Sequence, residues 1–407
     1  MVKMTEKKII WLTPLIIDIQ LHRTTQLEII KNLAKKGYNI ILIGTRSKNM
    51  FRLHDTPDEL SSNLPRLLLV PIRYFPVITP AIYAFIATFL LPFSILSFNP
   101  DFVIIDPDIS VISSIPGIIV SKFRKIKFVL DIRSVPVELQ GFRGTLRNFW
   151  FNISVLIAKR LFSGITIITP MMKKDVCNDF SLKPSEVGIW TSGVSATLFD
   201  PDACGIQGNK LRNRFGLSGK FVVFYHGNLS SMRGILDTYE AMKILVKKFS
   251  NIVLFLLGSG PIVCMLKSSI KNDNLQNNII IHDAVEYEQV PKFISMSDVC
   301  IIPLPDSPSW RSQSPLKLLE YLSMEKVVIA TDIHAHRSVL NNQKCCIYLS
   351  SVNPEEIAKA IEYAFTNRER LAGWGITGRK IVLQKYTWKK VAEVFEHYLL
   401  YNASRHS

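Results

Sequence analysis

A lysine and a glutamate three residues apart stand out in the segment SPLKLLEYLSMEKVVIATD (314–332). Pro315 suits the first turn of a helix, and the spacing places Lys317 and Glu320 on the same side of that helix, near its N-terminus. The carboxylate can bind two ribose hydroxyls and the ammonium can bind a phosphate. The helix dipole strengthens the attraction for an anion, each contact contributing roughly 0.3 to 2 kcal/mol. The alternative is an exposed Lys–Glu pair within the helix, worth about 0.2 to 0.5 kcal/mol.

The residues around this helix favour the ligand interpretation. An apolar strand follows at 327–330, so the helix is expected to pack on a sheet and to direct its N-terminus toward the carboxyl edge, where open α/β sheets bind ligands. Upstream, the segment HGNLSSMRG (226–234) ends a strand in a glycine loop, after which Arg233 and Gly234 begin a helix. Backbone N–H groups and the guanidinium could hold a diphosphate there, although an ordinary turn with a solvated arginine fits the segment equally well.

A second glycine turn, LLGSGP (256–261), ends the next predicted strand. Gly258 and Gly260 flank Ser259 and carry no Cβ atom, so either a ligand or a neighbouring backbone can come close to this turn. The residue types alone do not separate the two interpretations.

The elements that position these residues alternate in a regular order. Short apolar runs such as KKIIWL, YNIILIG, FVIID and KFVLDI alternate with longer amphipathic stretches, and the alternation starts again at KFVVFYHG. This order is typical of parallel α/β sheets, and strands that are apolar throughout indicate sheets covered by helices on both faces. A polar, turn-rich stretch at 198–212 is predicted to link the two halves. The chain is therefore expected to form two Rossmann-like α/β domains that face each other across a cleft.

Six segments together resemble glycosyltransferases of the GT-B fold, and family 4 most closely. They are TSGVSATLFDP (191–201), HGNLSSMRG, LLGSGP, SDVCIIPL (297–304), SPLKLLEYLSMEKVVIATD and the terminal YTW (386–388). The resemblance implies an acceptor-side domain at 1–200, a nucleotide-sugar donor domain at 201–385, and a C-terminal helix at 386–407 that crosses back to the first domain. It also implies a retaining, hexosyltransferase-type enzyme that moves a sugar from a nucleoside-diphosphate sugar to an acceptor hydroxyl.

The resemblance assigns roles to individual residues. Arg233 and Lys317 would neutralise the leaving diphosphate, and Glu320 would anchor the ribose by positioning it. It also tips the glycine turn toward ligand contact. Further donor contacts fall to Gly227, Asn228, Gly258, Gly260, Ser312 and Ser314. Two positions depart from the family pattern: Asn228 stands where the family has an arginine of the diphosphate clamp, and Ser312 stands where it has the first of two glutamates.

The first half of the chain is less distinctive. The family often has a Gly-Gly turn after its first strand, whereas this chain has PLIIDIQLHRTTQ (14–26), in which His22 and Arg23 are more typical of a surface pair than of catalysis. Arg133 follows the strand KFVLDI and stands where many relatives have a histidine that positions the donor sugar, so the resemblance makes it a catalytic candidate. Asp131 lies on the same side of that strand, and an Asp131–Arg133 pair is an equally good interpretation.

Composition bears on cofactors and partners. No metal or other cofactor is expected, because the resemblance implies metal-independent transfer and DPD (106–108) suits a turn better than a metal-binding loop. The six cysteines form no C-x-x-C pair, which indicates reduced thiols in a cytoplasmic protein. A net charge of +16 favours anionic partners. Nucleic acid is not expected among them, since the basic residues form no stripe interleaved with aromatic residues.

One uncharged segment, AIYAFIATFLLPFSILSF (81–98), reaches the lower length bound of about 18 residues for a membrane span. Because Pro92, Thr88, Ser94 and Ser97 interrupt it, we expect a helix that is buried or lies at a membrane surface. Together with FWFNISVLIAKRLF (149–162), it favours peripheral contact with the inner face of a membrane and a lipid-linked or polysaccharide glycan acceptor. Buried helices of a Rossmann domain would have the same composition.

A second class of function stays open. The departures at Asn228 and Ser312 and the absent Gly-Gly turn also fit a non-catalytic module that keeps the GT-B fold and binds a nucleotide-sugar or a membrane surface. Donor turnover would separate the two classes. A nucleotide-sugar 2-epimerase is a further enzyme with this fold, although the pattern around Glu320 favours transfer. The nucleotide base, the sugar, the acceptor, the linkage and the oligomeric state do not follow from the sequence.

Overall fold

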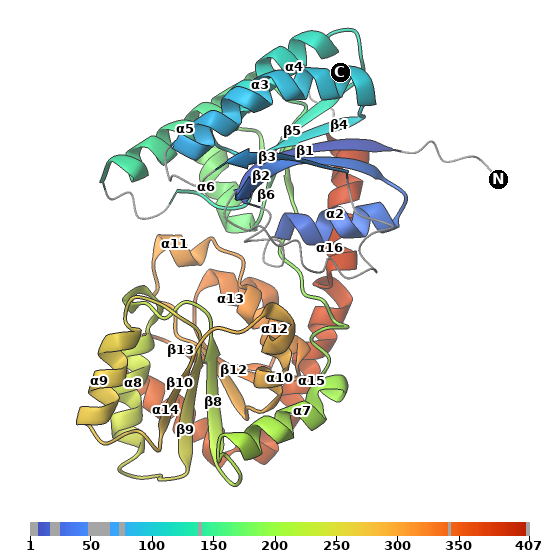
Figure 1. Cartoon of the computed structure of the whole chain (residues 1–407). Helices are drawn as coiled ribbons and strands as arrows, with labels where there is room; N and C mark the ends of the chain where they lie inside the picture. The colour runs from blue at the N-terminus through green and yellow to red at the C-terminus, as the bar shows by residue number, and fades with distance from the viewer. Residues whose placement is uncertain are drawn as a thin grey trace, which may run out of the picture. The chain divides into compact units, whose positions relative to one another are not determined.

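The structure, a computed structural model, describes residues 7–16, 25–47, 66–72, 78–136, 141–340 and 343–403. The chain forms two compact units. The first unit consists of Met1–Thr191 and Trp388–Ser407, and the second unit consists of Ser192–Thr387. Figure 1 shows that each unit is built around a sheet on which helices pack.

The sheet of the first unit is parallel, and its described strands lie in the order β3-β2-β1-β4-β5-β6-β7. The strands are β1 (Lys8–Ile16), β2 (Asn39–Ser47), β3 (Arg66–Ile72), β4 (Phe102–Ile105), β5 (Lys127–Ile132), β6 (Gly164–Ile167) and β7 (Val187–Ile189). The helices are α2 (Thr25–Lys35), α3 (Ile78–Phe98), α4 (Ser114–Ser121), α5 (Gly141–Leu161), α6 (Pro170–Phe180) and α16 (Trp388–His397). Shorter turns are η2 (Ile109–Ser113), η3 (Pro184–Glu186) and the π-helical η6 (Tyr398–Asn402).

The sheet of the second unit is also parallel, with the strand order β10-β9-β8-β11-β12-β13. Its strands are β8 (Phe221–His226), β9 (Ile252–Leu257), β10 (Ile279–His282), β11 (Val299–Ile302), β12 (Val327–Thr331) and β13 (Cys346–Leu349). Its helices are α7 (Pro201–Arg214), η4 (Ser231–Arg233), α8 (Ile235–Leu245), α9 (Val263–Asn272), η5 (Tyr287–Gln289), α10 (Val290–Ser295), α11 (Pro308–Arg311), α12 (Leu316–Ser323), α13 (His334–Leu340), α14 (Pro354–Thr366) and α15 (Arg368–Lys385).

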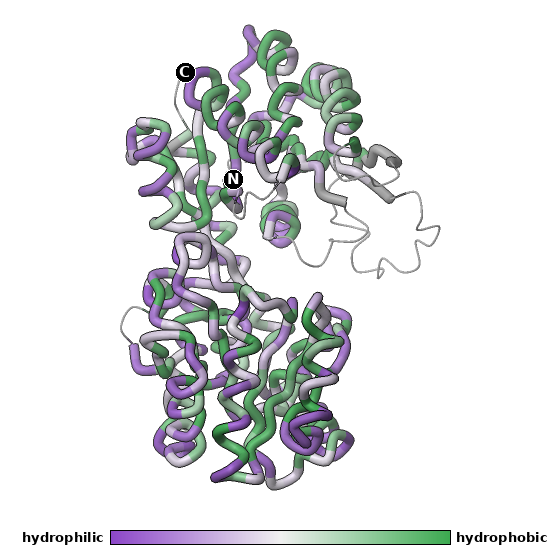
Figure 2. The backbone as a smooth tube through the Cα atoms, turned by 90° about the vertical axis from the view of Figure 1, so that its left-hand side faces the viewer, coloured by the Kyte–Doolittle hydropathy of each residue, from purple (hydrophilic) through white to green (hydrophobic). Residues whose placement is uncertain are grey.

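Central strands in both units carry apolar side chains on both faces. All residues of β4, β9, β11 and β12 are buried, which a sheet achieves only when helices cover its two sides. Figure 2 shows the hydrophobic colouring concentrated in the strands of the second unit, with hydrophilic turns around them. Complete burial of one aliphatic or aromatic side chain contributes about 1.5 to 3 kcal/mol to the free energy of unfolding. Because the strands contain many such side chains, the main hydrophobic cores lie along the two sheets.

The elements near the predicted chemistry form as the sequence indicates. The predicted helix after Ser-Pro is confirmed as α12, and the apolar strand after it is confirmed as β12. The uncharged segment 81–98 lies within α3. All six cysteines are free.

The predicted linker at 198–212 is wrong. Residues Pro201–Arg214 form α7, whose N-terminus is capped by the Asp200 side chain accepting a hydrogen bond from Asp202 N at 3.1 Å. The segment resembles a loop because the helix is mostly exposed and polar. Its Gly208 serves close packing, since a Cβ atom there would lie 2.6 Å from Ser295 Oγ. The two units divide instead between Thr191 and Ser192.

The C-terminal helix α16 packs within the first unit. Phe395 contacts Trp11 and Trp190, with ring centroids 5.6 Å and 4.9 Å away. The Tyr398 hydroxyl, just after α16, donates a hydrogen bond to Ile165 O at 3.1 Å. These aromatic side chains are buried, so the last turns of the chain complete the core of the first unit.

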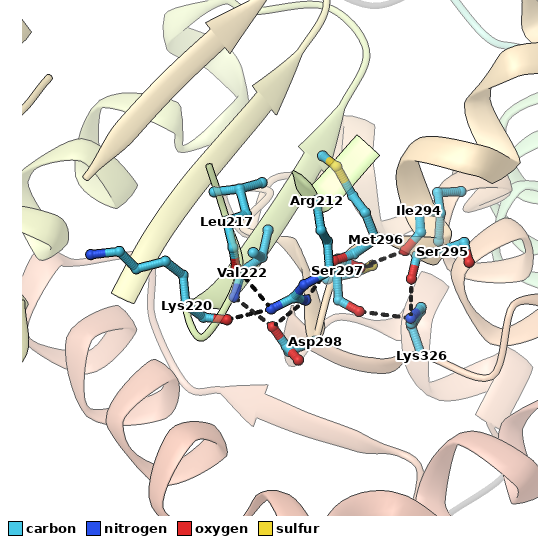
Figure 3. Close-up of polar contacts among 11 residues, drawn as sticks. Arg212, Leu217, Lys220, Val222, Ile294, Ser295, Met296, Ser297, Asp298 and Lys326 are labelled. Carbon is cyan, nitrogen blue, oxygen red and sulfur yellow. Dashed lines mark hydrogen bonds and ion pairs between the residues drawn. The ribbon is translucent and has the colours of Figure 1, made fainter. Parts of the chain in front are cut away.

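A polar network ties α7 to the amino edge of the second sheet, as Figure 3 shows. The Arg212 guanidinium donates to Met296 O at 2.8 Å and to Leu217 O at 3.3 Å, and it forms an ion pair with Asp298 at 3.1 Å. Asp298 Oδ2 in turn accepts a hydrogen bond from Val222 N at 2.7 Å. The Arg212 side chain thus supplies hydrogen-bond donors to carbonyl groups at the ends of several elements.

Lys326 supports the same edge from the start of β12. Its Nζ atom donates to Ser295 O at 3.0 Å and to Ser297 O at 2.6 Å (Figure 3). Burial lowers the pKa of this ammonium, mainly because it is removed from water. The two basic side chains together fix the loop between α10 and β11.

We predict that Arg212→Met lowers the free energy of unfolding by about 2 to 3 kcal/mol, because the substitution leaves carbonyl groups and the Asp298 carboxylate without their donor. Urea unfolding followed by circular dichroism measures the change. Lys210→Met on the exposed side of the same helix is the matched control and should stay within about 0.5 kcal/mol of the wild type. Equal effects of the two substitutions would contradict a stabilising role for the network.

Candidate functional site

The residues predicted to bind a ligand in the second unit lie at the topological switch point of its sheet. Strands β8 and β11 are neighbours, yet the chain continues from β8 toward β9 and β10 on one side and from β11 toward β12 and β13 on the other. The loops after β8 and β11 therefore diverge at the carboxyl edge, where open α/β sheets bind ligands. Residues 227–234 follow β8, and residues 303–315 follow β11.

Glycines let the loops at this edge pack backbone against backbone. Gly258 has a φ of +153°, and a Cβ atom there would lie 1.9 Å from Gly227 O. A Cβ atom at Gly260 would lie 2.1 Å from Leu229 O, and one at Gly234 would lie 1.9 Å from Pro303 O. A neighbouring backbone therefore accounts for Gly258 and Gly260, and the close packing holds the loops after β8, β9 and β11 in one arrangement.

Lys317 occupies space that Gly227 leaves open. A Cβ atom at Gly227 would lie 2.8 Å from Lys317 Cε, and Lys317 Nζ lies 5.6 Å from the centre of the Tyr225 ring. The pKa of Lys317 is lowered to about 8, mainly by burial and also by the positive charge of Arg233, while the charge of Glu320 opposes the shift. The ammonium is thus desolvated and lies close to a second cation.

Arg233 is positioned by two aromatic residues. Its guanidinium carbon lies 4.8 Å from the centre of the Trp310 ring, a cation–π contact. Burial raises the pKa of Tyr225 to about 12, and a hydrogen bond with Arg233 opposes that rise. Helix α8 begins directly after Gly234 and has no side-chain cap at its N-terminus. Arg233 therefore lies two residues before the first residue of α8.

Glu320 is buried in a hydrogen-bond network. Its Oε1 accepts from the Tyr287 hydroxyl at 3.0 Å, and its Oε2 lies 3.0 Å from His226 Nε2. The Tyr321 hydroxyl accepts from His226 N at 3.1 Å and lies 3.0 Å from His226 Nδ1. The hydroxyl hydrogen can then donate to Nδ1, which leaves the proton on Nε2 to donate to Glu320. The carboxylate is thereby fixed, and each oxygen retains a lone pair for a further donor.

The structure therefore brings Arg233, Lys317 and Glu320 together at one edge of the second sheet. Asn228 is exposed in the same loop, and its carbonyl accepts from the Tyr225 hydroxyl at 3.1 Å. The serines after β11 make contacts within the unit: Ser312 is buried and donates to Pro308 O at 3.2 Å, and Ser314 Oγ accepts from Ser192 N at 3.3 Å.

Arg133 belongs to the first unit, at the end of β5. Its guanidinium carbon lies 3.4 Å from the centre of the Trp190 ring, and it donates to Trp190 O at 2.7 Å. Burial lowers the pKa of Arg133 to about 10. Among the described ion pairs none joins Arg133 to Asp131, although the charge of each favours the charged form of the other. Asp131 Oδ1 accepts from Thr166 at 2.8 Å and from Trp190 Nε1 at 2.9 Å. The pair that the sequence offered as one of two interpretations is thus a charge interaction without a direct ion pair.

A cavity of about 620 Å³ opens beside Arg133 in the first unit. Its lining includes Asp106, Asp131 and Trp150. Burial raises the pKa of Asp131 to about 6 and that of Asp106 well above its ordinary value. Hydrogen bonds from Thr13 at 2.6 Å and from Gln26 at 2.9 Å hold the Asp106 carboxyl. The cavity thus presents carboxyl groups and a guanidinium in its lining.

The DPD segment, the expected absence of a metal site and the His22–Arg23 pair remain to be compared with the structure. Asp108 of the DPD segment caps η2 by accepting from Ser110 N at 2.7 Å, and burial raises its pKa to about 6. Within the described part of the chain, no group of three or more His, Cys, Asp or Glu side chains could hold a metal ion. His22 and Arg23 lie outside the described residues.

Sequence reasoning missed His226 and Tyr287, the two side chains that hold Glu320. His226 ends a buried strand directly before Gly227, at the carboxyl edge, and this position was an available signal. Tyr287 lies 33 residues before Glu320 in a short 3-10 turn, and no local pattern indicates its role.

Comparisons with protein families, curated proteins and solved structures all find glycosyltransferases among the matches. Residues 209–381 match the protein family described as Glycosyl transferases group 1. Among curated relatives, the chain is similar to an alpha-D-kanosaminyltransferase of Streptomyces kanamyceticus, with 24% identity over 166 residues, which is 40% of this chain and 42% of that protein. The matches to the first curated relatives span about half of those proteins' own length.

Solved structures resemble the chain over nearly its whole length. A glycosyltransferase from Rickettsia africae has a TM-score of 0.75 at 18% identity, covering 99% of this chain and 100% of that one. Anabaena HepE, solved in complex with UDP and glucose, has a TM-score of 0.70 at 13% identity, covering 97% of this chain and 99% of that one. The expected GT-B fold, with its two parallel-sheet α/β domains, is confirmed.

We predict that Gly258→Ala lowers the free energy of unfolding by about 2 to 4 kcal/mol, because the new Cβ atom meets the Gly227 carbonyl and the backbone conformation disfavours a side chain. Gly205→Ala is the matched control. It lies inside α7 with no atom within 4 Å of the new Cβ, so it should stabilise the chain by about 0.5 to 1 kcal/mol. Chemical denaturation compares the two, and a neutral Gly258→Ala would contradict the close packing of the loops.

Proposed function

We propose that this protein is a glycosyltransferase whose second unit binds a nucleoside-diphosphate sugar. The proposal is carried by the convergence of Arg233, Lys317 and Glu320 at the switch point, beside the uncapped N-terminus of α8. Two cations, a fixed carboxylate and helix N–H groups match a ligand that combines a diphosphate with a ribose. The family match over residues 209–381 and the likeness to HepE, solved with UDP and glucose, support the proposal.

Each of the three side chains has a distinct part in binding the donor. Arg233 and Lys317 bind the diphosphate oxygens, and the anion relieves the repulsion between the two cations. Glu320 accepts hydrogen bonds from the ribose hydroxyls with the lone pairs that Tyr287 and His226 leave open. Its part is to position the donor, and it transfers no proton.

The proposed reaction retains the configuration of the sugar. The bond between the anomeric carbon and the β-phosphate oxygen breaks, and its electron pair leaves with the nucleoside diphosphate. An acceptor hydroxyl forms the new bond on the same face and passes its proton to the leaving phosphate oxygen. Arg233 and Lys317 stabilise the developing negative charge, a type of contact whose removal costs about 10² to 10³ in kcat. The scheme requires neither a protein nucleophile nor a metal ion.

Finer assignments extend this proposal. We place the protein in family 4, as a hexosyltransferase, because its Ser-Pro-x-Lys-x-x-Glu segment belongs to a recognisable variant of that family's site. The acceptor is a lipid-linked glycan or a polysaccharide of the cell envelope, and the polar cavity beside Arg133 is its proposed binding place. The enzyme acts in the cytoplasm at the inner face of the membrane. The direct role of Arg133 toward the donor sugar stays a prediction.

A donor screen tests the proposed function. Among UDP-, GDP- and ADP-hexoses, one base is expected to raise the midpoint of thermal unfolding, since a ligand at 100 times its Kd stabilises by about 2.7 kcal/mol. Glu320→Gln should remove most of the shift because the amide cannot accept both ribose hydroxyls. Glu240→Gln, at an exposed carboxylate of the same unit, should leave the shift unchanged. The absence of any response to all three donors would contradict donor binding.

Turnover separates an enzyme from a binding module in the same experiment. The preferred donor should release its nucleoside diphosphate slowly in the absence of acceptor. Arg233→Ala should lower that rate by about 10² or more while the protein stays folded. Binding without release, in the wild type and with acceptor present, would favour the non-catalytic alternative.

The pKa of Lys317 predicts how donor affinity depends on pH. With a pKa lowered to about 8, the ammonium is charged below that pH and loses its proton as the pH rises through it, well before an ordinary lysine does. Calorimetric affinity for the nucleoside diphosphate should therefore fall between pH 8 and pH 9.5, by up to about tenfold per unit. The nucleoside alone is the control, and Lys317→Met should bind weakly with no such decline. A wild-type affinity that stays constant to pH 9.5 would contradict the assignment.

A further inference from the structure

Helix α3 of the first unit exposes a continuous row of large apolar side chains. Ile78, Ile82, Phe85, Phe89, Phe93 and Leu96 are all exposed, and the three phenylalanines are 65–69% exposed. Their spacings of three and four residues place them within an arc of about 80° on one side of the helix. Isolated apolar side chains at a surface are ordinary, but a row of this length is not.

The opposite side of α3 is part of the core. Tyr83, Ala87, Leu91 and Ile95 are fully buried, and the Tyr83 hydroxyl donates to Ile43 O at 2.8 Å. Among the described helices, α3 is the one long and apolar enough to cross a membrane by length and composition. Crossing would remove these side chains from the core and break the contact with β2. The helix is therefore suited to lie along a surface, with one side in the protein and the other outward.

Helix α4 extends the exposed row. The two helices touch, since a Cβ atom at Gly117 would lie 3.2 Å from both Leu91 Cδ2 and Ile95 Cδ1. Figure 1 shows them adjacent. Ile112, Ile115 and Ile119 are exposed at the same spacing, and Phe123, one turn further, is 96% exposed. We call the exposed residues of α3, η2 and α4, together with Phe123, the α3–α4 face.

The charged residues around the α3–α4 face indicate which kind of partner it binds. Neither Ile78–Phe98 nor Ile109–Ser121 contains a charged residue. Directly after α4, the segment KFRK (122–125) brackets Phe123 with Lys122, Arg124 and Lys125, of which the two lysines are exposed. A row of phenylalanine and isoleucine ending in clustered cations matches an anionic lipid surface, because rings enter the boundary between headgroups and acyl chains while ammonium groups meet phosphates.

We propose that the α3–α4 face docks the protein on an anionic membrane, with Phe85, Phe89 and Phe93 inserted below the headgroups and the segment 122–125 on the lipid phosphates. A second copy of the chain fits less well, since its own α3–α4 face has the same cations and no acidic side chain to oppose them. The inference makes the membrane partner of the proposed function specific. Docking itself does not depend on donor binding or on sugar transfer.

Vesicle sedimentation tests the proposal with the full chain. Wild-type protein should partition at least tenfold more strongly onto vesicles of equimolar phosphatidylcholine and phosphatidylglycerol than onto phosphatidylcholine alone. Phe85→Ser/Phe89→Ser/Phe93→Ser should lower partitioning onto the anionic vesicles at least tenfold. Lys122→Gln/Lys125→Gln should remove the preference for the anionic vesicles. Ile206→Ser, at an apolar side chain that is 71% exposed on α7 of the second unit, is the matched control and should bind like the wild type.

The readouts separate docking from catalysis and from folding. Circular dichroism and the thermal shift with nucleoside diphosphate should be unchanged in the triple phenylalanine variant, since its substitutions lie in the exposed row. Wild-type partitioning by that variant would overturn the proposal. Equal binding to both kinds of vesicle would overturn its anionic specificity. A wild-type dimer in light scattering that the triple variant loses, without vesicle binding, would assign the face to a second copy. Vesicle binding without donor binding would refute the proposed function alone.

Discussion

Backbone-to-backbone packing of three loops is the constraint on which the candidate site depends. At the carboxyl edge of the second sheet, the turns after β8 and β9 touch through Gly227 and Gly258, and the turn before α8 meets the end of β11 through Gly234. A Cβ atom at Gly258 or Gly234 would lie 1.9 Å from a carbonyl oxygen of the neighbouring loop and would separate the loops. The space saved beside Gly227 is filled by the Lys317 side chain, so the position of the ammonium follows from the absence of a Cβ atom.

Two positively charged side chains lie close together in the candidate site. Arg233 lies close enough to Lys317 to disfavour the positive charge of the lysine, and burial of Lys317 removes water that would screen it. The negative charge of Glu320 offsets part of this repulsion. Hydrogen bonds with Tyr287 and His226 fix its carboxylate in place. The diphosphate of the proposed donor would offset this repulsion, and groups that are already held in place stabilise charge at low reorganisation cost.

Helix α3 is apolar on two opposite sides, one of which is buried and the other exposed. Its inner side fills the core against the first sheet, where Tyr83 and Leu91 are fully buried, and its outer side presents Phe85, Phe89 and Phe93 to the surroundings. The inner contacts fix the helix in the protein and so determine which side chains face outward. A surface that is apolar, uncharged and bordered by cations then follows from the fold of the first unit.

Local patterns in the sequence determined the parallel α/β fold, the helix after Ser-Pro and the placement of Lys317 and Glu320 on one side of it, since strand composition and helix spacing act over a few residues. Three further features depend on the tertiary structure and do not follow from local sequence patterns. It joined His226 and Tyr287 to Glu320 across 94 and 33 residues, and it formed α7 where polar composition predicted a linker. It also determined which phenylalanines of α3 are exposed. Hydropathy is the same for a buried and an exposed ring, and only packing against the sheet distinguishes them.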